Sequence, residues 1–165
     1  MKIKNFMAMM IAAASLSVGV VSCGDDDDED APATTDVKSL AETVSGTYNG
    51  VLSIQMMDMP FSDTVAYNIK KVDDSHINLT IPSISYMTME IPSVEISNIE
   101  VKGTASSATA SVAKVEGAIT VEGEEKSYTL TDILVNCTDN KAVITYSITY
   151  GKMPRPMSCS FEGTK

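Results

Sequence analysis

From residue 46 to the end of the chain, apolar and polar side chains alternate with a period of two, and we find no convincing helical stretch. The alternation recurs in short segments that are separated by turn residues such as Asp, Asn, Gly and Pro. These segments include 48–56, 65–70, 77–81, 87–91, 115–121, 128–137 and 144–150, and in the fourth of them Met87, Met89 and Ile91 share the inward face. One apolar and one polar face per strand indicates antiparallel pairing with one face in water. The pattern therefore predicts an all-β fold, either a sandwich or a barrel.

Three local features refine this prediction. Val94 and Ile96 share one parity, whereas Ile99 and Val101 share the other, so we expect a β-bulge or a corner at Asn98. Residues 104–113 are nearly all Ser, Ala and Thr, which predicts an edge strand or a loose loop. One helical turn is expected at residues 40–44, at the end of a linker.

The N-terminus has the composition of an export signal. Lys2 and Lys4 precede an apolar stretch, residues 6–21, which is too short to cross a hydrocarbon core of roughly 20 helical residues. Cys23 follows small residues in a pattern that resembles a relaxed lipobox, so we expect cleavage before Cys23 and attachment of lipid to it. The alternative is an ordinary secretory signal. The predicted domains are a signal peptide (1–22), a lipidated cysteine with an acidic tether and linker (23–45), and a β-barrel (46–165).

Residues 25–30 are all acidic, and such a run cannot fold alone because its charges repel one another. The run resembles the surface-export signal of Bacteroidota-type lipoproteins, which implies an outer-membrane protein exposed at the cell surface. A periplasm-facing spacer is the alternative. Beyond the run, residues 31–165 carry 10 basic and 16 acidic side chains. This balance argues against nucleic acid and against electrostatic binding of anionic lipid heads, so we expect membrane contact through the lipid on Cys23.

We expect no catalytic residue, metal site or cofactor, and hence no enzyme. His76 is the single histidine and shares the polar face of its strand with Asn78, an exposed setting that does not suit a Ser-His-Asp arrangement. One histidine with dispersed cysteines has no zinc-ligand spacing. The carboxylates that could serve glycoside hydrolysis should mostly face solvent; they are Glu90, Glu95, Glu100 and Glu116.

Cys137 and Cys159 are the two cysteines beyond the lipidation site. In an oxidising compartment they could form a disulfide. Cys159 also alternates with Met157 and Phe161, as a buried free cysteine would. Both alternatives stay open at the level of sequence.

The two ends of the predicted domain resemble the calycin-like β-barrel lipoproteins. The resemblance rests on Ser-Gly-Thr-Tyr-Asn-Gly at 45–50 and Met-Ser-Cys-Ser-Phe-Glu-Gly-Thr-Lys at 157–165. It implies a single up-and-down, lipocalin-like barrel of about eight strands over residues 46–165. Gly46-x-Tyr48 is similar to the Gly-x-Trp that opens lipocalin barrels, although this chain has no tryptophan. In lipocalins a basic side chain lies over that ring, and Lys165 or Arg155 would take this place here.

Barrels of eight strands are either filled by side chains or hold one small ligand. The resemblance implies a small apolar or amphipathic ligand, with Met56, Met59 and Phe61 at the mouth of the barrel. The candidate ligand-binding residues are Tyr48, Ile54, Met56, Met59, Phe61, Tyr67, Met87, Met89 and Tyr146. Methionines can also bind soft metals or simply pack in a core. The predicted function is a lipid-anchored ligand-binding protein; the alternative is a non-catalytic accessory subunit of an outer-membrane surface complex.

Overall fold

The structure of the protein, a computed structural model, describes residues 38–87 and 89–165. The predicted signal peptide, Cys23 and the acidic run lie outside these residues, so the predictions made for them stay predictions. The described part of the chain forms a short helix and ten strands: α1 (Leu40–Val44), β1 (Gly46–Met56), β2 (Met59–Lys71), β3 (His76–Ile81), β4 (Ile84–Tyr86), β5 (Met89–Ile91), β6 (Val94–Thr104), β7 (Ser107–Val121), β8 (Glu124–Thr138), β9 (Lys141–Tyr150) and β10 (Met157–Thr164).

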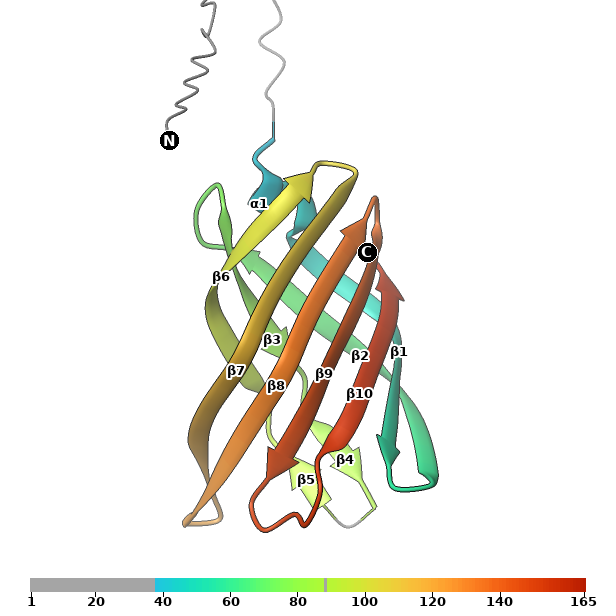
Figure 1. Ribbon diagram of the computed structural model, residues 1–165, viewed down its shortest axis with the longest axis vertical. Helices are drawn as coiled ribbons and strands as arrows, with labels where there is room; N and C mark the ends of the chain where they lie inside the picture. The colour runs from blue at the N-terminus through green and yellow to red at the C-terminus, as the bar shows by residue number, and fades with distance from the viewer. Residues whose placement is uncertain (1–37, 88) are drawn as a thin grey trace, which may run out of the picture. The chain divides into compact units, whose positions relative to one another are not determined.

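Eight of the strands close an antiparallel barrel in the order β1, β2, β3, β6, β7, β8, β9 and β10, and β10 pairs back with β1 (Figure 1). Neighbours in the barrel are neighbours along the chain, apart from the β4–β5 hairpin between β3 and β6. This confirms the predicted all-β, up-and-down barrel. The described residues belong to one compact unit with its own core, so this unit can fold by itself.

The β4–β5 hairpin corrects one part of the sequence prediction, which placed Met87 and Met89 together on one strand face. Met87 has a φ of 54° in the turn that joins the two short strands. The chain therefore reverses at Met87, and the side chain does not face the barrel interior. Ile84, Tyr86 and Ile91 of the hairpin are buried. Figure 1 shows the hairpin at the end of the barrel opposite α1.

The predicted break in alternation at Asn98 is confirmed as a β-bulge. The register between β3 and β6 shifts there, because β6 has one residue more than β3 between the flanking pairs. Asn98 has a φ of 58°, and its N–H donates a hydrogen bond to Oδ1 of Asn78 at 2.9 Å. A second irregularity lies in β8 at Asp132, whose φ is 55°. Each bulge turns its strand so that apolar side chains still point inward after the parity changes.

The helix α1 closes one end of the barrel. Ser39 caps its first turn by accepting a hydrogen bond from the N–H of Glu42 at 3.3 Å. Ala41 and Val44 are buried in the core. The folded unit therefore begins before residue 46, and the end of the predicted linker is part of the barrel. Among the described residues, no helix is long and apolar enough to cross a membrane.

Tyr48 and Lys165 hold this end together. The Tyr48 hydroxyl donates to the carbonyl oxygen of Val44 at 2.8 Å, and the ring is fully buried. Lys165 Nζ lies 5.4 Å from the centroid of that ring and donates to the carbonyl oxygens of Thr43 and Ser45. Of the two basic residues considered, Lys165 is the one over the ring.

We expect Tyr48→Phe to destabilise the protein by about 1–2 kcal/mol, because the buried carbonyl of Val44 loses its hydrogen-bond donor while the ring still fills its space. Urea unfolding followed by circular dichroism measures the change. Thr47→Ala, at the exposed neighbouring position, is the control and should change stability by no more than about 0.5 kcal/mol. Equal stability of Tyr48→Phe and the unsubstituted protein would contradict the assignment.

Candidate functional site

The middle of the barrel is filled by its own side chains. The hydroxyls of Tyr67 and Tyr146 lie 2.7 Å apart, and the ring centroids of Tyr67 and Phe161 are separated by 4.3 Å. Burial raises the pKa of both tyrosines. Of the candidate ligand-binding residues, four are buried in this packed core: Tyr48, Ile54, Tyr67 and Tyr146. Their positions suit packing at least as well as contact with a ligand.

Cys137 and Cys159 are both buried and free in the structure. The sulfur of Cys137 lies 3.8 Å from the Tyr48 hydroxyl, near α1, whereas Cys159 pairs across strands with Tyr146. Each thiol therefore has its own tyrosine neighbour, and the disulfide alternative is not realised. Burial raises the pKa of Cys159 to about 11 and also raises that of Cys137.

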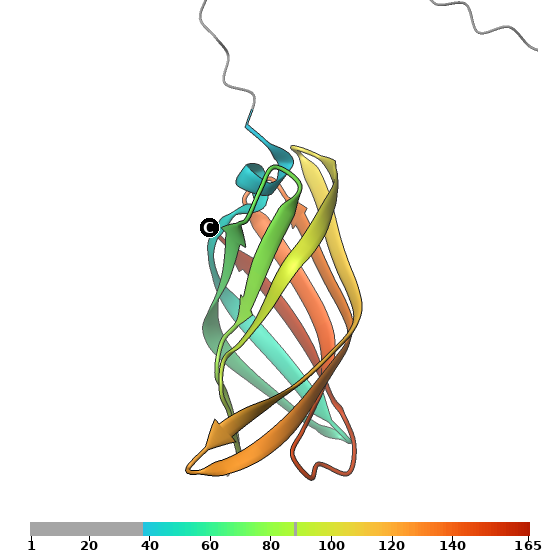
Figure 2. The ribbon, with the colours of Figure 1, turned by 90° about the vertical axis from the view of Figure 1, so that its left-hand side faces the viewer.

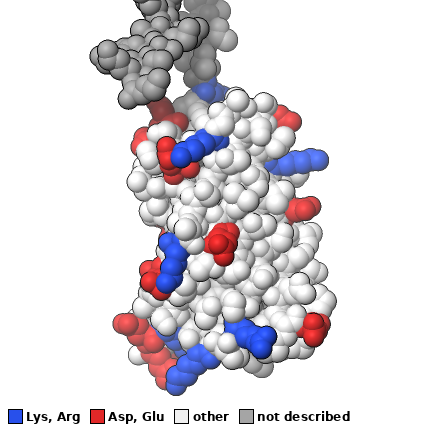
Figure 3. Space-filling view, viewed as in Figure 1, with Lys and Arg blue, Asp and Glu red and all other residues white. Residues whose placement is uncertain are grey.

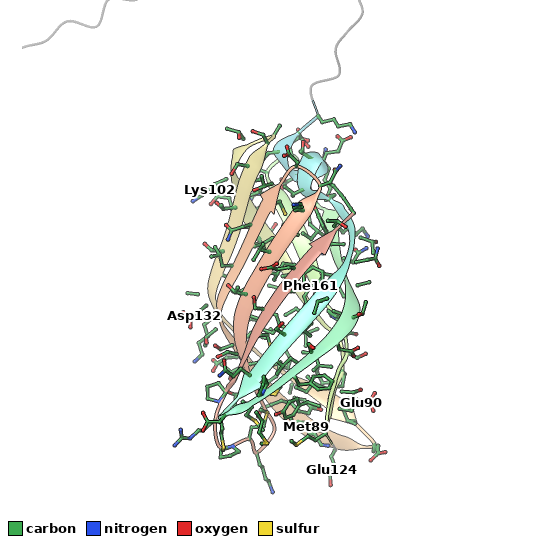
Figure 4. The ribbon with its side chains drawn as sticks, turned by 90° about the vertical axis from the view of Figure 1, so that its right-hand side faces the viewer. Met89, Glu90, Lys102, Glu124, Asp132 and Phe161 are labelled. Atoms are coloured by element: carbon green, nitrogen blue, oxygen red, sulfur yellow. The ribbon has the colours of Figure 1, made fainter. Side chains whose placement is uncertain are left out.

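The other five candidate residues gather at the end of the barrel opposite α1, in or beside the loops and the β4–β5 hairpin found there. We call this the methionine end, and it comprises Met56, Met57, Met59, Phe61, Met87, Met89 and Met153. Met87 and Met57 are 70% and 55% exposed, and Met59 and Phe61 are exposed as well. Figure 4 shows side-chain sulfur atoms at this end, with Met89 among them. Exposed apolar side chains grouped in this way mark an interaction or ligand site.

Contacts link the loops of the methionine end. The ring of Phe61 packs edge-on against that of Tyr86, with centroids 5.7 Å apart. The Tyr86 hydroxyl donates to the carbonyl oxygen of Met59 at 3.3 Å, and Tyr86 pairs with Met89 in the hairpin. The hairpin is thereby held against the start of β2. This places its two methionines beside the opening instead of inside the barrel.

A pocket of about 580 Å³ opens at the methionine end. Its walls come from β5, from the start of β8, and from the end of β9 with the loop that follows; they are Met89, Glu124, Glu125, Lys126, Ser127, Tyr150, Gly151, Lys152 and Met153. The backbone N–H of Tyr150 lies 3.2 Å from the sulfur of Met153. The Tyr150 hydroxyl is buried, and no described residue hydrogen-bonds to it. Thioethers, an unpaired hydroxyl and nearby charges suit an amphipathic molecule.

A larger hollow of about 720 Å³ lies on the barrel wall, around exposed or half-exposed hydroxyl groups of β1, β2, β9 and β10. Its polar lining includes Ser53, Gln55, Ser62, Thr145, Ser147, Ser158 and Ser160. Asp132 projects from the outer surface beside it (Figure 4). The visible face over β8 to β10 carries few charges (Figure 3). Although it is larger, this open, hydroxyl-lined surface has no exposed aromatic or methionine side chain besides Phe61 at its edge.

His76 is the first residue of β3, directly after a turn, and has no catalytic geometry. Its Nδ1 is 2.9 Å from Asp73 Oδ1 and 3.1 Å from Ser75 Oγ. Both neighbours thus approach the same nitrogen, whereas a Ser-His-Asp relay needs one on each nitrogen. Hydrogen bonds from the Ser75 backbone and from His76 lower the pKa of Asp73 to about 2. The cluster stabilises a surface turn.

Of the residues that line this pocket, the sequence prediction named Met89 alone, and Tyr150 and Met153 are among those that it missed. Tyr150 ends the alternating segment 144–150, and Met153 follows in the Pro-rich turn. A search for methionines just outside alternating segments would have found Met153 together with Met57. No sequence signal shows that the Tyr150 hydroxyl lacks a partner, because this depends on what surrounds it in the folded chain.

Comparisons with known proteins agree with the barrel. The family model of the calycin-like beta-barrel domain matches residues 44–164. The chain is also similar to the crystal structure of a candidate outer membrane protein from Bacteroides fragilis NCTC 9343, with 22% sequence identity and a TM-score of 0.60. The similarity covers 78% of this chain and 53% of the other, so this chain spans about half the length of that protein. No curated protein sequence matches the chain.

Proposed function

Since the chain belongs to the calycin-like β-barrel domain family, we propose that it is a non-catalytic binding protein of the outer membrane, anchored by lipid on Cys23. In this proposal the methionine end takes up a small apolar or amphipathic molecule. The supporting observation is the group of exposed apolar side chains around the pocket that Met89, Tyr150 and Met153 line.

The position of this end supports the proposal. The described chain enters at α1, and α1 closes that end of the barrel. A tether attached there leaves the opposite end free to meet molecules from solution. Because the core between the two ends is packed, the ligand would bind at the opening and not deep inside. Flexible thioether side chains can adapt to apolar groups of different shapes.

The test uses the chain from residue 24 to 165 and the neutral fluorescent probe N-phenyl-1-naphthylamine. We expect saturable binding of the probe, weakened about tenfold or more by Met59→Glu and by Met89→Glu, because a charge on the rim must lose water when the probe binds. Val51→Glu is the matched control, since Val51 is exposed on the outer wall of β1. Absence of saturable binding, or equal affinity in all four proteins, would contradict the proposal.

A second candidate function is that of an accessory subunit that contacts a protein partner through the methionine end. The packed barrel core supports it, because such a protein needs no internal cavity. Photo-crosslinking from position 87 in intact outer membranes distinguishes the two. A single crosslinked protein band, without any probe binding in solution, favours the accessory subunit.

A further inference from the structure

The strand β7 has an unpaired edge. On one side it pairs with β8 over its whole length, from Ser107 to Val121. On the other side it pairs with β6 through four residues, Ser107 to Ala110. Within residues 38–87 and 89–165, the segment 111–121 therefore has no strand partner on its second side. Figure 2 shows β6 and β7 together at their hairpin and apart toward the other end.

The bulge in β6 explains this separation. At Asn98 the extra residue changes the direction of β6, and the Asn98 N–H donates to the side chain of Asn78 on β3 instead of to the backbone of a neighbouring strand. From Val94 to Glu100 the strand pairs with β3 alone. The four residues Ser107 to Ala110 that pair with β6 keep the barrel continuous. The remaining segment of β7, residues 111–121, is an edge strand.

This edge has little of the protection that edge strands usually carry. Segment 111–121 contains no proline, and Ser111, Ala113, Ala118 and Thr120 are small, exposed residues that let another strand approach. Its two charged residues are Lys114 and Glu116, which flank Val115. They form an exposed ion pair with each other at 2.7 Å. A backbone edge of this kind favours addition of a strand.

We propose that the edge pairs with the same edge of a second copy of this chain, antiparallel and centred on Val115. A two-fold axis at Val115 places Lys114 opposite Glu116 of the partner subunit, and Glu116 opposite Lys114 of the partner subunit. Opposite charges directly across an antiparallel pair are stabilising, and a two-fold interface repeats the contact. This complementarity favours a second copy over an unrelated strand, because the segment itself carries both charges at the two positions that the two-fold axis brings opposite each other.

Charge reversal tests the proposal with the chain from residue 24 to 165, which contains the whole barrel unit. Sedimentation equilibrium should show a monomer–dimer equilibrium for the unsubstituted protein. Lys114→Glu and Glu116→Lys should each weaken the dimer about tenfold or more, because each creates two like-charge pairs. The double variant Lys114→Glu/Glu116→Lys should restore it. An equimolar mixture of the two single variants should also form dimers, since all charge pairs are then opposite.

Thermal unfolding by circular dichroism provides the folding control, and all variants should unfold within a few degrees of one another because both side chains are exposed. A protein that stays monomeric up to 1 mM would overturn the proposal. So would single variants that dimerise as tightly as the unsubstituted protein, or a mixture that stays monomeric.

Discussion

Gly50→Ala is expected to prevent the barrel from closing and to reduce stability by about 4 kcal/mol or more, so that most of the protein is unfolded or insoluble. Gly50 lies on β1 directly opposite Gly163 on β10, where the last strand meets the first. A Cβ on Gly50 would overlap the carbonyl oxygen of Glu162 and the Cα of Gly163. Because both are backbone atoms, no side-chain rotation can relieve the overlap.

The measurement is urea unfolding of the soluble fraction, together with the yield of soluble protein. Val51→Ala, at the next position of the same strand, is the control because Val51 points outward and is 49% exposed. It should change stability by no more than about 0.5 kcal/mol. A Gly50→Ala protein with unchanged urea midpoint would show that the β1–β10 seam is looser than the structure indicates.

Stability should fall steeply above pH 9, because the core contains acidic groups that are buried in their neutral form. Burial raises the pKa of Cys159 from 9.0 to about 11. Between these values the unfolded chain loses this proton and the folded chain keeps it, so the folded state binds more protons and stability falls as pH rises. A shift of this size corresponds to about 2–3 kcal/mol by pH 11. The pKa values of Cys137, Tyr48, Tyr67 and Tyr146 are raised by burial in the same direction.

Urea midpoints measured from pH 8 to pH 11 test this expectation. The midpoint should be nearly constant up to pH 9, and the folded state should be lost near pH 11, since the combined effect approaches the 5–15 kcal/mol stability of an ordinary domain. Cys159→Ala should reduce the stability at pH 8 but flatten the decline between pH 9 and pH 11. A midpoint that is the same at pH 8 and pH 10.5 would contradict the assigned burial.

The bulge at Asn98 shows what local sequence can reveal. A change of parity in the apolar pattern is visible without any structure, because inward side chains must stay inward on both sides of an extra residue. The sequence pattern did not show that β6 moves away from β7 at this bulge and leaves one edge of β7 unpaired. This separation depends on which strand follows β6 in space and over how many residues the two pair.

The methionines show the limit of the same reasoning. Alternation placed Met87 and Met89 on one inward face, but the chain reverses at Met87 and leaves that side chain 70% exposed. A three-residue strand is too short for its pattern to distinguish one strand from two. The prediction nevertheless identified five residues of the methionine end, because methionines clustered near the turns between predicted strands.

The alternating pattern alone predicted the all-β class, the inward faces of the long alternating segments and the positions of the turns, because a period of two can bury one face only in a sheet. The sequence also predicts the attachment of lipid to Cys23. Three features became visible in the folded chain alone: the sheet closes where Gly50 meets Gly163, the core is filled, and the methionines of separate loops meet at one end. These features depend on contacts between residues far apart in the chain, and no local pattern encodes which distant side chains share a space.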